Sequence, residues 1–344
     1  MRKVPRPRQR AGPLKYLFPG WYAIVMGLAG LSLAWHHAAP VMGKGADLAA
    51  LLIGSLAAAV FAVLAVATVL RGQRYPQAWA EDRQHPVRHT AIATLPTSVL
   101  LLATVALATG AQGTAVLTLW WAGALAQLAV TAWVLTRWWK GARQGGLQWA
   151  SITPALFITV VGNLLVPLAG VPLGQPEWST AQFGIGLLFW PVLTVLLRVR
   201  IAKQGVWAER LLPANFIFIA PPAVAGLAAL QFGAPPLVGW ALWGMAVFLL
   251  LWLAPLGRRI ASQPLGLPHW DISFPLAAFT ALSLRLMAGG PLAMAGVALL
   301  AASTLLVAAL ALATLRGLRQ GTLLVAEVLP IAAAPTAVDW PAKS

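Results

Sequence analysis

The sequence has no cysteine and little charge of either sign. Only 9% of its 344 residues are charged and 8 are acidic, whereas 60% are hydrophobic. The absence of cysteine excludes disulfides, iron–sulfur clusters and thiol catalysis. A soluble domain would carry about a quarter of its residues charged, so the composition is typical of a chain embedded in a membrane.

Long apolar runs are what the sequence has in abundance. Each is close to the roughly 20 residues that a helix needs to cross a bilayer core. We therefore predict an all-α integral membrane protein with ten transmembrane helices. The runs occupy residues 20–39, 48–70, 90–109, 114–136, 151–171, 180–199, 211–231, 236–256, 270–288 and 291–315.

Basic residues fall in alternate gaps between these runs. Of 24 lysines and arginines, only Lys44 and Arg285 lie on the other side. Because basic loops resist translocation, the pattern predicts a multi-pass protein of the inner membrane with both termini cytoplasmic. The 22 alternating cations are Arg2, Lys3, Arg6, Arg8, Arg10, Lys15, Arg71, Arg74, Arg83, Arg88, Arg137, Lys140, Arg143, Arg198, Arg200, Lys203, Arg210, Arg258, Arg259, Arg316, Arg319 and Lys343.

The net charge of +16 does not predict a nucleic-acid partner. The cations are divided among short loops and form no single basic face, so we expect contact with anionic lipid instead. The chain then divides into a cytoplasmic N-terminal arm (1–18), a transmembrane domain (19–315) and a cytoplasmic C-terminal tail (316–344). Short outer connections join its helices into five tandem hairpins.

Interior prolines distinguish the odd-numbered spans from the even-numbered ones. Pro96, Pro154, Pro221 and Pro275 fall in spans three, five, seven and nine. A proline removes one helical hydrogen bond and usually kinks the helix. In a bilayer, the freed carbonyls are tolerated where protein or a water-filled cavity meets them. We therefore predict that the odd-numbered helices surround a conduit and that the even-numbered helices face outward.

Few polar side chains lie within the spans. Asn163 is in the middle of span five, where pore lining and an interhelical hydrogen bond are equal alternatives. His36 ends span one, at an aqueous mouth or among lipid headgroups. Arg285, near the outer end of span nine, either lines a vestibule or extends to the membrane surface.

The spans contain no equipment for catalysis. No span holds a carboxylate well inside, and the sequence lacks paired aspartates for magnesium diphosphates, G-x-S-x-G and H-E-x-x-H. We predict no enzyme activity, catalytic residue, cofactor or metal site. The remaining possibility is that a solute passes through a narrow, mostly apolar conduit. The N-termini of half-helices carry partial positive charge and would favour anions there.

Six stretches with characteristic composition follow one another along residues 17–315. They are Phe18–Leu31, His85–Arg88, Thr153–Leu156 with Val161–Asn163, Phe183–Trp190, Ile219–Val224 and Ser273–Ala278. Together, in this order and spacing, they resemble the tellurite-resistance/dicarboxylate transporter family. That family includes bacterial tellurite-resistance anion channels, plant guard-cell slow-type anion channels, and fungal malate and sulfite transporters.

The resemblance implies a passive anion channel or facilitator in which five hairpins surround a pore lined by the odd-numbered helices. It also implies a homotrimer with one pore per protomer, and a phenylalanine of the ninth helix that plugs the pore. The residue of this sequence that matches the plug is Phe274, which precedes Pro275. Phe279 of the same span is the alternative candidate for the gate. An aromatic ring at a proline kink is a credible gate because it dewets a constriction.

Two other functions remain open. One is an ion-coupled transporter of C4-dicarboxylates, sulfite or tellurite-like oxyanions with the same architecture. The other is a membrane scaffold that moves no solute.

Overall fold

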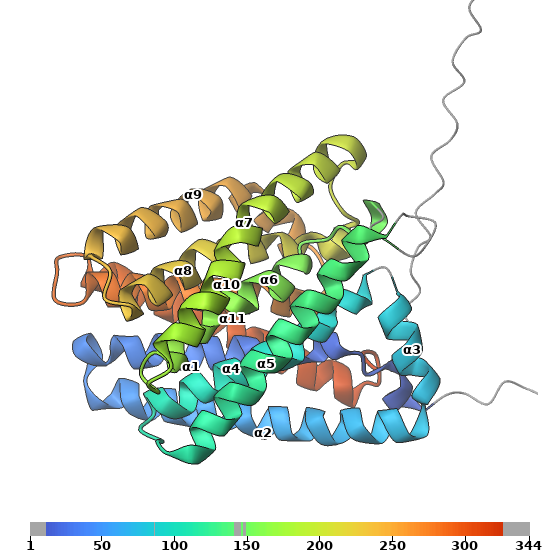
Figure 1. Cartoon of the computed structure of the whole chain (residues 1–344), viewed down its shortest axis with the longest axis horizontal. Helices are drawn as coiled ribbons and strands as arrows, with labels where there is room; N and C mark the ends of the chain where they lie inside the picture. Colours follow the sequence, from blue (N-terminus) through green and yellow to red (C-terminus); the bar gives the residue numbers. More distant parts are fainter. Residues whose placement is uncertain (1–11, 86, 141–145, 147–148, 326–344) are drawn as a thin grey trace, which may run out of the picture.

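In the computed structural model, residues 12–85, 87–140, 146 and 149–325 are described, and every regular element among them is helical (Figure 1). The N-terminal arm before Gly12 and the tail beyond Val325 lie outside the described residues. The α-helices are α1 (Ala23–Met42), α2 (Lys44–Arg74), α3 (Pro76–Gln84), α4 (Thr94–Ala108), α5 (Thr114–Thr136), α6 (Leu156–Gly170), α7 (Pro176–Gln204), α8 (Ala220–Gln231), α9 (Pro236–Ala261), α10 (Trp270–Met287) and α11 (Ala293–Arg319). Seven of the basic residues used above also lie outside: Arg2, Lys3, Arg6, Arg8, Arg10, Arg143 and Lys343.

Among the described residues, eight helices are long and apolar enough to cross a membrane. They correspond to eight of the ten predicted runs. The other two runs form α6, a shorter apolar helix of 15 residues, and α10, which has 18 residues. Several helices extend past the predicted ends of the runs. For example, α2 covers Lys44–Arg74 where the apolar run is 48–70.

Consecutive long helices pack against each other in pairs. The pairs are α1 with α2, α4 with α5, α6 with α7, α8 with α9, and α10 with α11. The turns of the first, fourth and fifth pairs lie together at the left of Figure 1. The tightest of these turns is a single residue, Gly43, whose φ of 70° is accessible to glycine at little cost.

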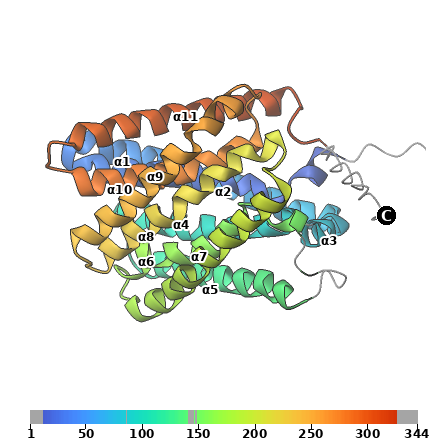
Figure 2. The same ribbon diagram turned by 90° about the horizontal axis from the view of Figure 1, so that it is seen from above.

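The first members of these pairs form a closed ring. Helix α1 contacts α4, α4 contacts α6, α6 contacts α8, α8 contacts α10, and α10 returns to α1. We call these the ring helices, and α2, α5, α7, α9 and α11 the peripheral helices. Figure 2 shows the peripheral helices α5 and α7 on the side of the molecule opposite α11.

Burial separates the two sets of helices. In the most apolar 18-residue stretch of each span, 94% of residues are buried at α8 and the segment before it, but only 17% at α9. Exposed apolar side chains on the peripheral helices are what a bilayer would cover, because lipid replaces the protein neighbours that a soluble core requires.

Each peripheral helix approaches the ring helices through a glycine. An added Cβ at Gly54, Gly123, Gly186, Gly239 or Gly296 would come within 3.0 Å of a ring-helix side chain. These are small-residue contacts of the kind that allow transmembrane helices to pack closely. At Gly123 and Gly186 a backbone nitrogen of the ring helix would also lie within 3.2 Å of the added Cβ, so alanine there would push the peripheral helix away from the ring.

All five ring helices are preceded by 3₁₀ turns, which wind more tightly than α-helix. The turns are η2 (Pro19–Tyr22) before α1, η3 (Arg88–Ala93) before α4, η6 (Trp149–Ser151) before α6, η7 (Glu209–Ile219) before α8 and η8 (Leu267–His269) before α10. The expected helix-interior prolines belong largely to these junctions. Pro96 lies in the first turn of α4, Pro221 in the first turn of α8, and Pro154 precedes α6. Of the four prolines, only Pro275 lies beyond the first turn of an α-helix. A proline is tolerated in a first turn because its missing N–H would have no partner there.

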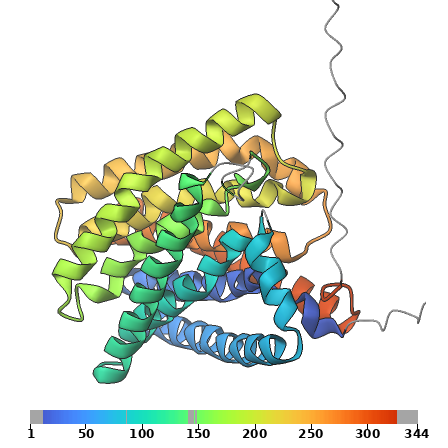
Figure 3. The ribbon, with the colours of Figure 1, turned by 45° about the vertical axis from the view of Figure 1, so that its right-hand side comes forward.

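Helix α3 turns back from the end of α2 toward η3 (Figures 1 and 3). Its Asp82 is fully buried and pairs with Arg71 of α2, Nη1 to Oδ2, at 2.7 Å. The Nε of Arg71 donates to the carbonyl oxygen of Lys15 at 3.0 Å. This ion pair therefore fastens α2, α3 and the start of the described chain to one another.

Candidate functional site

Two cavities lie at opposite ends of the ring. Each is lined by residues of all five ring segments, where a ring segment is a ring helix together with the turn that precedes it. The first, of about 220 Å³, is lined among others by His36 of α1, Thr104 of α4, Leu168 of α6, Leu227 of α8 and Arg285 of α10. We call it the Arg285 cavity. Because every ring helix contributes at least one residue to the lining, the cavity lies inside the ring, between its five helices.

The second cavity, of about 160 Å³, is enclosed by the 3₁₀ turns and the first turns of the ring helices. Its lining includes Gly20 of η2, Thr94 of α4, Ile158 of α6, Ala214 of η7 and Asp271 of α10. We call it the Asp271 cavity. The two carboxyl- and guanidinium-bearing residues that name the cavities are about 21 Å apart along α10.

The Arg285 cavity is basic. His36, His37 and Arg285 all line it, and none of its lining residues is acidic. The Nη1 of Arg285 donates to the Oε1 of Gln231 at 3.2 Å, which holds the guanidinium at the cavity wall. His36 has a carboxylate neighbour outside the lining, with its Nδ1 3.9 Å from the Oδ1 of Asp47.

The Asp271 cavity carries charges of both signs. Arg88 and Arg210 line it together with Asp271. The Nη1 of Arg88 lies 3.5 Å from the buried Oδ1 of Asp82, and its guanidinium lies 5.5 Å from the centre of the Phe18 ring. The cavity wall is therefore tied to the buried ion pair of α3.

His269 supports the same wall one residue before α10. Its Nδ1 accepts a hydrogen bond from the backbone N–H of Gly266 at 3.2 Å. Burial lowers the pKa of this imidazole below its usual value, and the backbone hydrogen bonds oppose that change only in part.

Phe274 lies on α10 between the two cavities. Asp271, Phe274, Ala278, Ala281 and Arg285 are spaced three and four residues apart, so they share one face of the helix. Leu282 falls on the same face by this spacing and packs toward Gly226 of α8, where an added Cβ would lie 2.7 Å from its Cδ2. Phe274, which is 6% exposed, is the aromatic side chain of this face between Asp271 and Arg285.

The Phe274 ring packs against the backbone of α1. A Cβ built at Gly30 would lie 3.1 Å from the Cδ2 of Phe274, tighter than ordinary contact. Glycine at position 30 therefore leaves the space that the ring occupies.

Phe279, the other aromatic ring considered for the gate, has a different environment. It stacks on Trp243 of the peripheral helix α9, with ring centres 6.1 Å apart and an interplanar angle of 23°. The ring is 2% exposed. Its contact is to a peripheral helix, whereas Phe274 contacts the ring helix α1.

Asn163 is fully buried in a hydrogen-bond network that joins α6 to two peripheral helices. Its Nδ2 donates to the Oγ1 of Thr131 on α5 at 2.9 Å, and its Oδ1 accepts from the Nε2 of Gln182 on α7 at 2.9 Å. These contacts support the interhelical alternative for Asn163, which is not among the lining residues of either cavity.

The structure brings His36 and Arg285 together in one cavity. Sequence reasoning considered His37 together with His36 at the outer end of span one, but it assigned neither Gln231 nor Asp271 to a site. It used Arg88 and Arg210 as markers of topology, and Arg88 also as part of the family resemblance. Their common signal is a polar residue at the end of an odd-numbered span, but the sequence does not show which ends meet.

Comparisons with known proteins show which sequences this chain is similar to. A family model named SLAC1 and described as a voltage-dependent anion channel matches residues 16–315. The chain is 25% identical over 266 residues to a tellurite resistance protein TehA homolog of Haemophilus influenzae, which covers 75% of this chain and 77% of that protein. It is 29% identical over 133 residues to the S-type anion channel SLAH2 of Arabidopsis thaliana, which covers 38% of this chain but 26% of the plant protein.

Proposed function

The chain belongs to the SLAC1 family, that of the tellurite resistance and S-type anion channel proteins, and from that premise we propose that it is a passive anion channel or facilitator. Anions would move down their electrochemical gradient through the ring, between the Arg285 cavity and the Asp271 cavity. The observation that carries this proposal is the pair of cavities lined by every ring segment. A scaffold would not need cavities at both ends of a closed ring.

The proposed membrane arrangement has ten spans in five tandem hairpins, in which the short helix α6 and the helix α10 are added to the eight helices that are long and apolar enough to cross a membrane. The support is the pairing of consecutive helices and the difference in burial between ring and peripheral helices. The charge alternation supports the proposal that both termini are cytoplasmic, and with that orientation the Asp271 cavity would open toward the cytoplasmic side of the inner membrane. The homotrimer stays a proposal from the family resemblance.

The proposed gate is Phe274. It is the aromatic residue of the α10 face between Asp271 and Arg285, its ring packs against α1 at Gly30, and Pro275 follows it inside α10. A ring in this position excludes water from a narrow passage, and a change of its rotamer would open the passage. Pro96, Pro154 and Pro221 would shape the conduit at the junctions of the 3₁₀ and α segments around the Asp271 cavity.

The test is the reversal potential of the purified chain in planar bilayers under a potassium chloride gradient, with the Phe274→Ala variant measured in parallel. We expect a potential near the chloride equilibrium value, and a current at least tenfold larger in the variant, because a tenfold change needs only about 1.4 kcal/mol less barrier. Phe279→Ala is the matched control and should leave the current unchanged. Equal currents in wild type and Phe274→Ala would sink the gate assignment.

A coupled transporter of C4-dicarboxylates, sulfite or tellurite-like oxyanions is the second candidate. The observation in its favour is Asp271, a carboxylate in a cavity of the ring, since proton-coupled transporters use such groups. Saturable uptake that collapses with the proton gradient, together with silent bilayers, would favour this function. No flux in either assay would favour a scaffold.

A further inference from the structure

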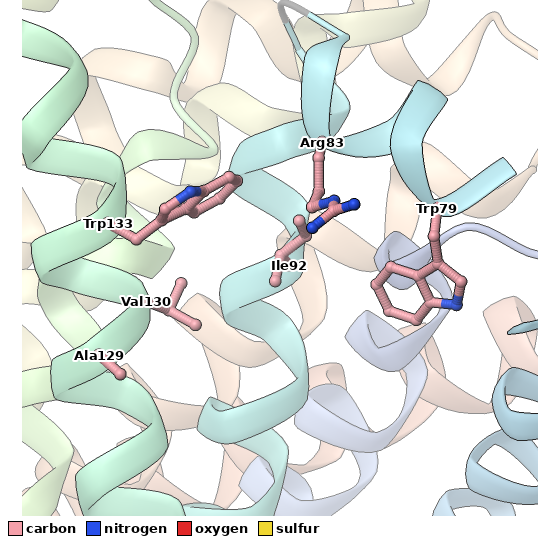
Figure 4. A pocket seen from close by; sticks show the side chains of 6 residues that line it. All are labelled: Trp79, Arg83, Ile92, Ala129, Val130 and Trp133. Atoms are coloured by element: carbon pink, nitrogen blue, oxygen red, sulfur yellow. The ribbon is translucent and has the colours of Figure 1, made fainter. Parts of the chain in front are cut away.

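A third cavity lies outside the ring, in a groove between α3 and α5. Its volume is about 570 Å³. Trp79 and Arg83 of α3 form one wall, Trp133 of α5 forms the other, and Ile92 and Val130 lie between them (Figure 4). Neither the conduit nor its gate uses this groove.

The rim of the groove is cationic. The exposed Arg83 extends into it between the two indole rings (Figure 4). The guanidinium of Arg137 lies 4.5 Å from the centre of the Trp133 ring and donates to the backbone oxygen of Arg83. None of the six lining residues is acidic, so nothing within the lining neutralises these charges.

The floor of the groove is apolar and deeper in the membrane. Ala129 and Val130 precede Trp133 by about one turn of α5, on the side toward the centre of this span. Tryptophans are typical of the boundary between headgroups and hydrocarbon. The groove thus has cations at headgroup level and an apolar surface below them.

We propose that this groove binds one anionic phospholipid. Its phosphate lies against Arg83 and Arg137, and an acyl chain follows Ile92, Val130 and Ala129 toward the membrane core. Basic pockets beside transmembrane helices recognise anionic headgroups by this charge complementarity, and the flanking indoles cover the glycerol region. The inference requires that α5 cross the membrane but not that the chain conduct anions.

Native mass spectrometry of the full chain, released from nanodiscs of equimolar phosphatidylglycerol and phosphatidylcholine, tests the proposal. We expect one retained phosphatidylglycerol per chain in preference to phosphatidylcholine. Arg83→Gln should weaken that preference about fivefold, as expected for one cation near a headgroup. Arg319→Gln, an equal loss of charge at an exposed position of α11, is the matched control and should keep the preference.

A second variant tests the acyl-chain surface without changing charge. Ala129→Trp fills the floor at an exposed position, so it is compatible with folding, and should reduce retention of both lipids; Ala122→Trp on the same helix should not. Equal effects of Arg83→Gln and Arg319→Gln, or no preference in the wild type, would overturn the proposal. A change in the number of chains per particle in Ala129→Trp would also overturn it, because the groove would then bind a second copy of the chain.

Discussion

The two cavities of the ring are built from the same five ring segments but differ in charge and in wall. The Arg285 cavity is lined by the ends of regular α-helices, and it presents one guanidinium, two histidines and no lining carboxylate. The Asp271 cavity is lined largely by 3₁₀ turns and the first turns of helices, and it combines Arg88 and Arg210 with Asp271. The comparison teaches that the two ends would attract anions in different ways, one through a single guanidinium held by Gln231 and the other through two guanidiniums beside a carboxyl group.

The largest expected effect is on stability and concerns the wall of the Asp271 cavity. Among the described residues, the lining residue Arg88 lies beside the buried ion pair of Asp82 and Arg71. Asp82→Asn leaves the guanidinium of Arg71 buried without its counter-charge, so it should lower the free energy of unfolding by about 3–5 kcal/mol. The measurement is thermal unfolding of the purified protein in one detergent. Glu81→Gln, the exposed neighbour on α3, is the control, and equal melting of the two variants would contradict the structural role of Asp82.

The next effect sharpens the comparison by removing a residue that belongs to neither cavity. Asn163→Ala breaks the hydrogen bonds to Thr131 and Gln182 and should lower stability by about 1–3 kcal/mol. Ion selectivity, read as the reversal potential, should stay at the wild-type value. A shifted reversal potential would return Asn163 to the lining of the pathway. Thr180→Ala, exposed on α7, should change neither quantity.

Asp271→Asn tests the carboxyl group directly. At an alkaline pH, where this group is ionised, the substitution removes one negative charge from the cavity and should raise anion current about threefold to tenfold, since a Coulomb difference of roughly 1 kcal/mol at effective dielectric constants near 20 is sufficient. Single-channel current in symmetric chloride is the measurement. Glu177→Gln removes an exposed charge from α7 and should have no effect. A lower current in Asp271→Asn would mean that the carboxylate assists passage.

The smallest effect is expected at the other cavity. Arg285→Gln should reduce anion current about threefold, and mainly for anions arriving from the Arg285 side, because a fixed cation raises the local anion concentration. The rectification ratio, recorded at opposite voltages, should therefore change. Lys44→Gln removes an exposed cation at the same end of the helices and is the control. An unchanged ratio would show that Arg285 does not face the pathway.

Much of the architecture could be predicted from the sequence, because a bilayer fixes the length of the helices that cross it and the side on which basic loops remain. The apolar runs correspond to helices, and eight of them are long and apolar enough to cross a membrane. The family resemblance from six stretches is confirmed by the match over residues 16–315. The role of Phe274 remains a prediction, although its place between two cavities supports it.

What the sequence could not predict is how helix faces meet. Asn163 looked equally suited to a pore or to an interhelical bond, and only its contacts with Thr131 and Gln182 distinguish the two. Pro96, Pro154 and Pro221 lie near junctions between 3₁₀ and α segments, which apolar periodicity does not resolve. The loop 71–89 has the pattern of a short amphipathic turn around Trp79, Glu81 and Asp82, and α3 lies there, but the pattern does not show that this helix forms a groove with α5.

The closure of the ring has a consequence for how the protein is made. The Nε1 of Trp35 on α1 donates to the Oγ1 of Thr304 on α11 at 3.1 Å, across 269 residues of chain. At elongation rates of 5–20 residues per second, about 13–54 s separate the synthesis of these two partners. Until α10 and α11 have been synthesised, α1 lacks these two neighbours. During that time something else must cover the face of α1 that they bury in the finished protein.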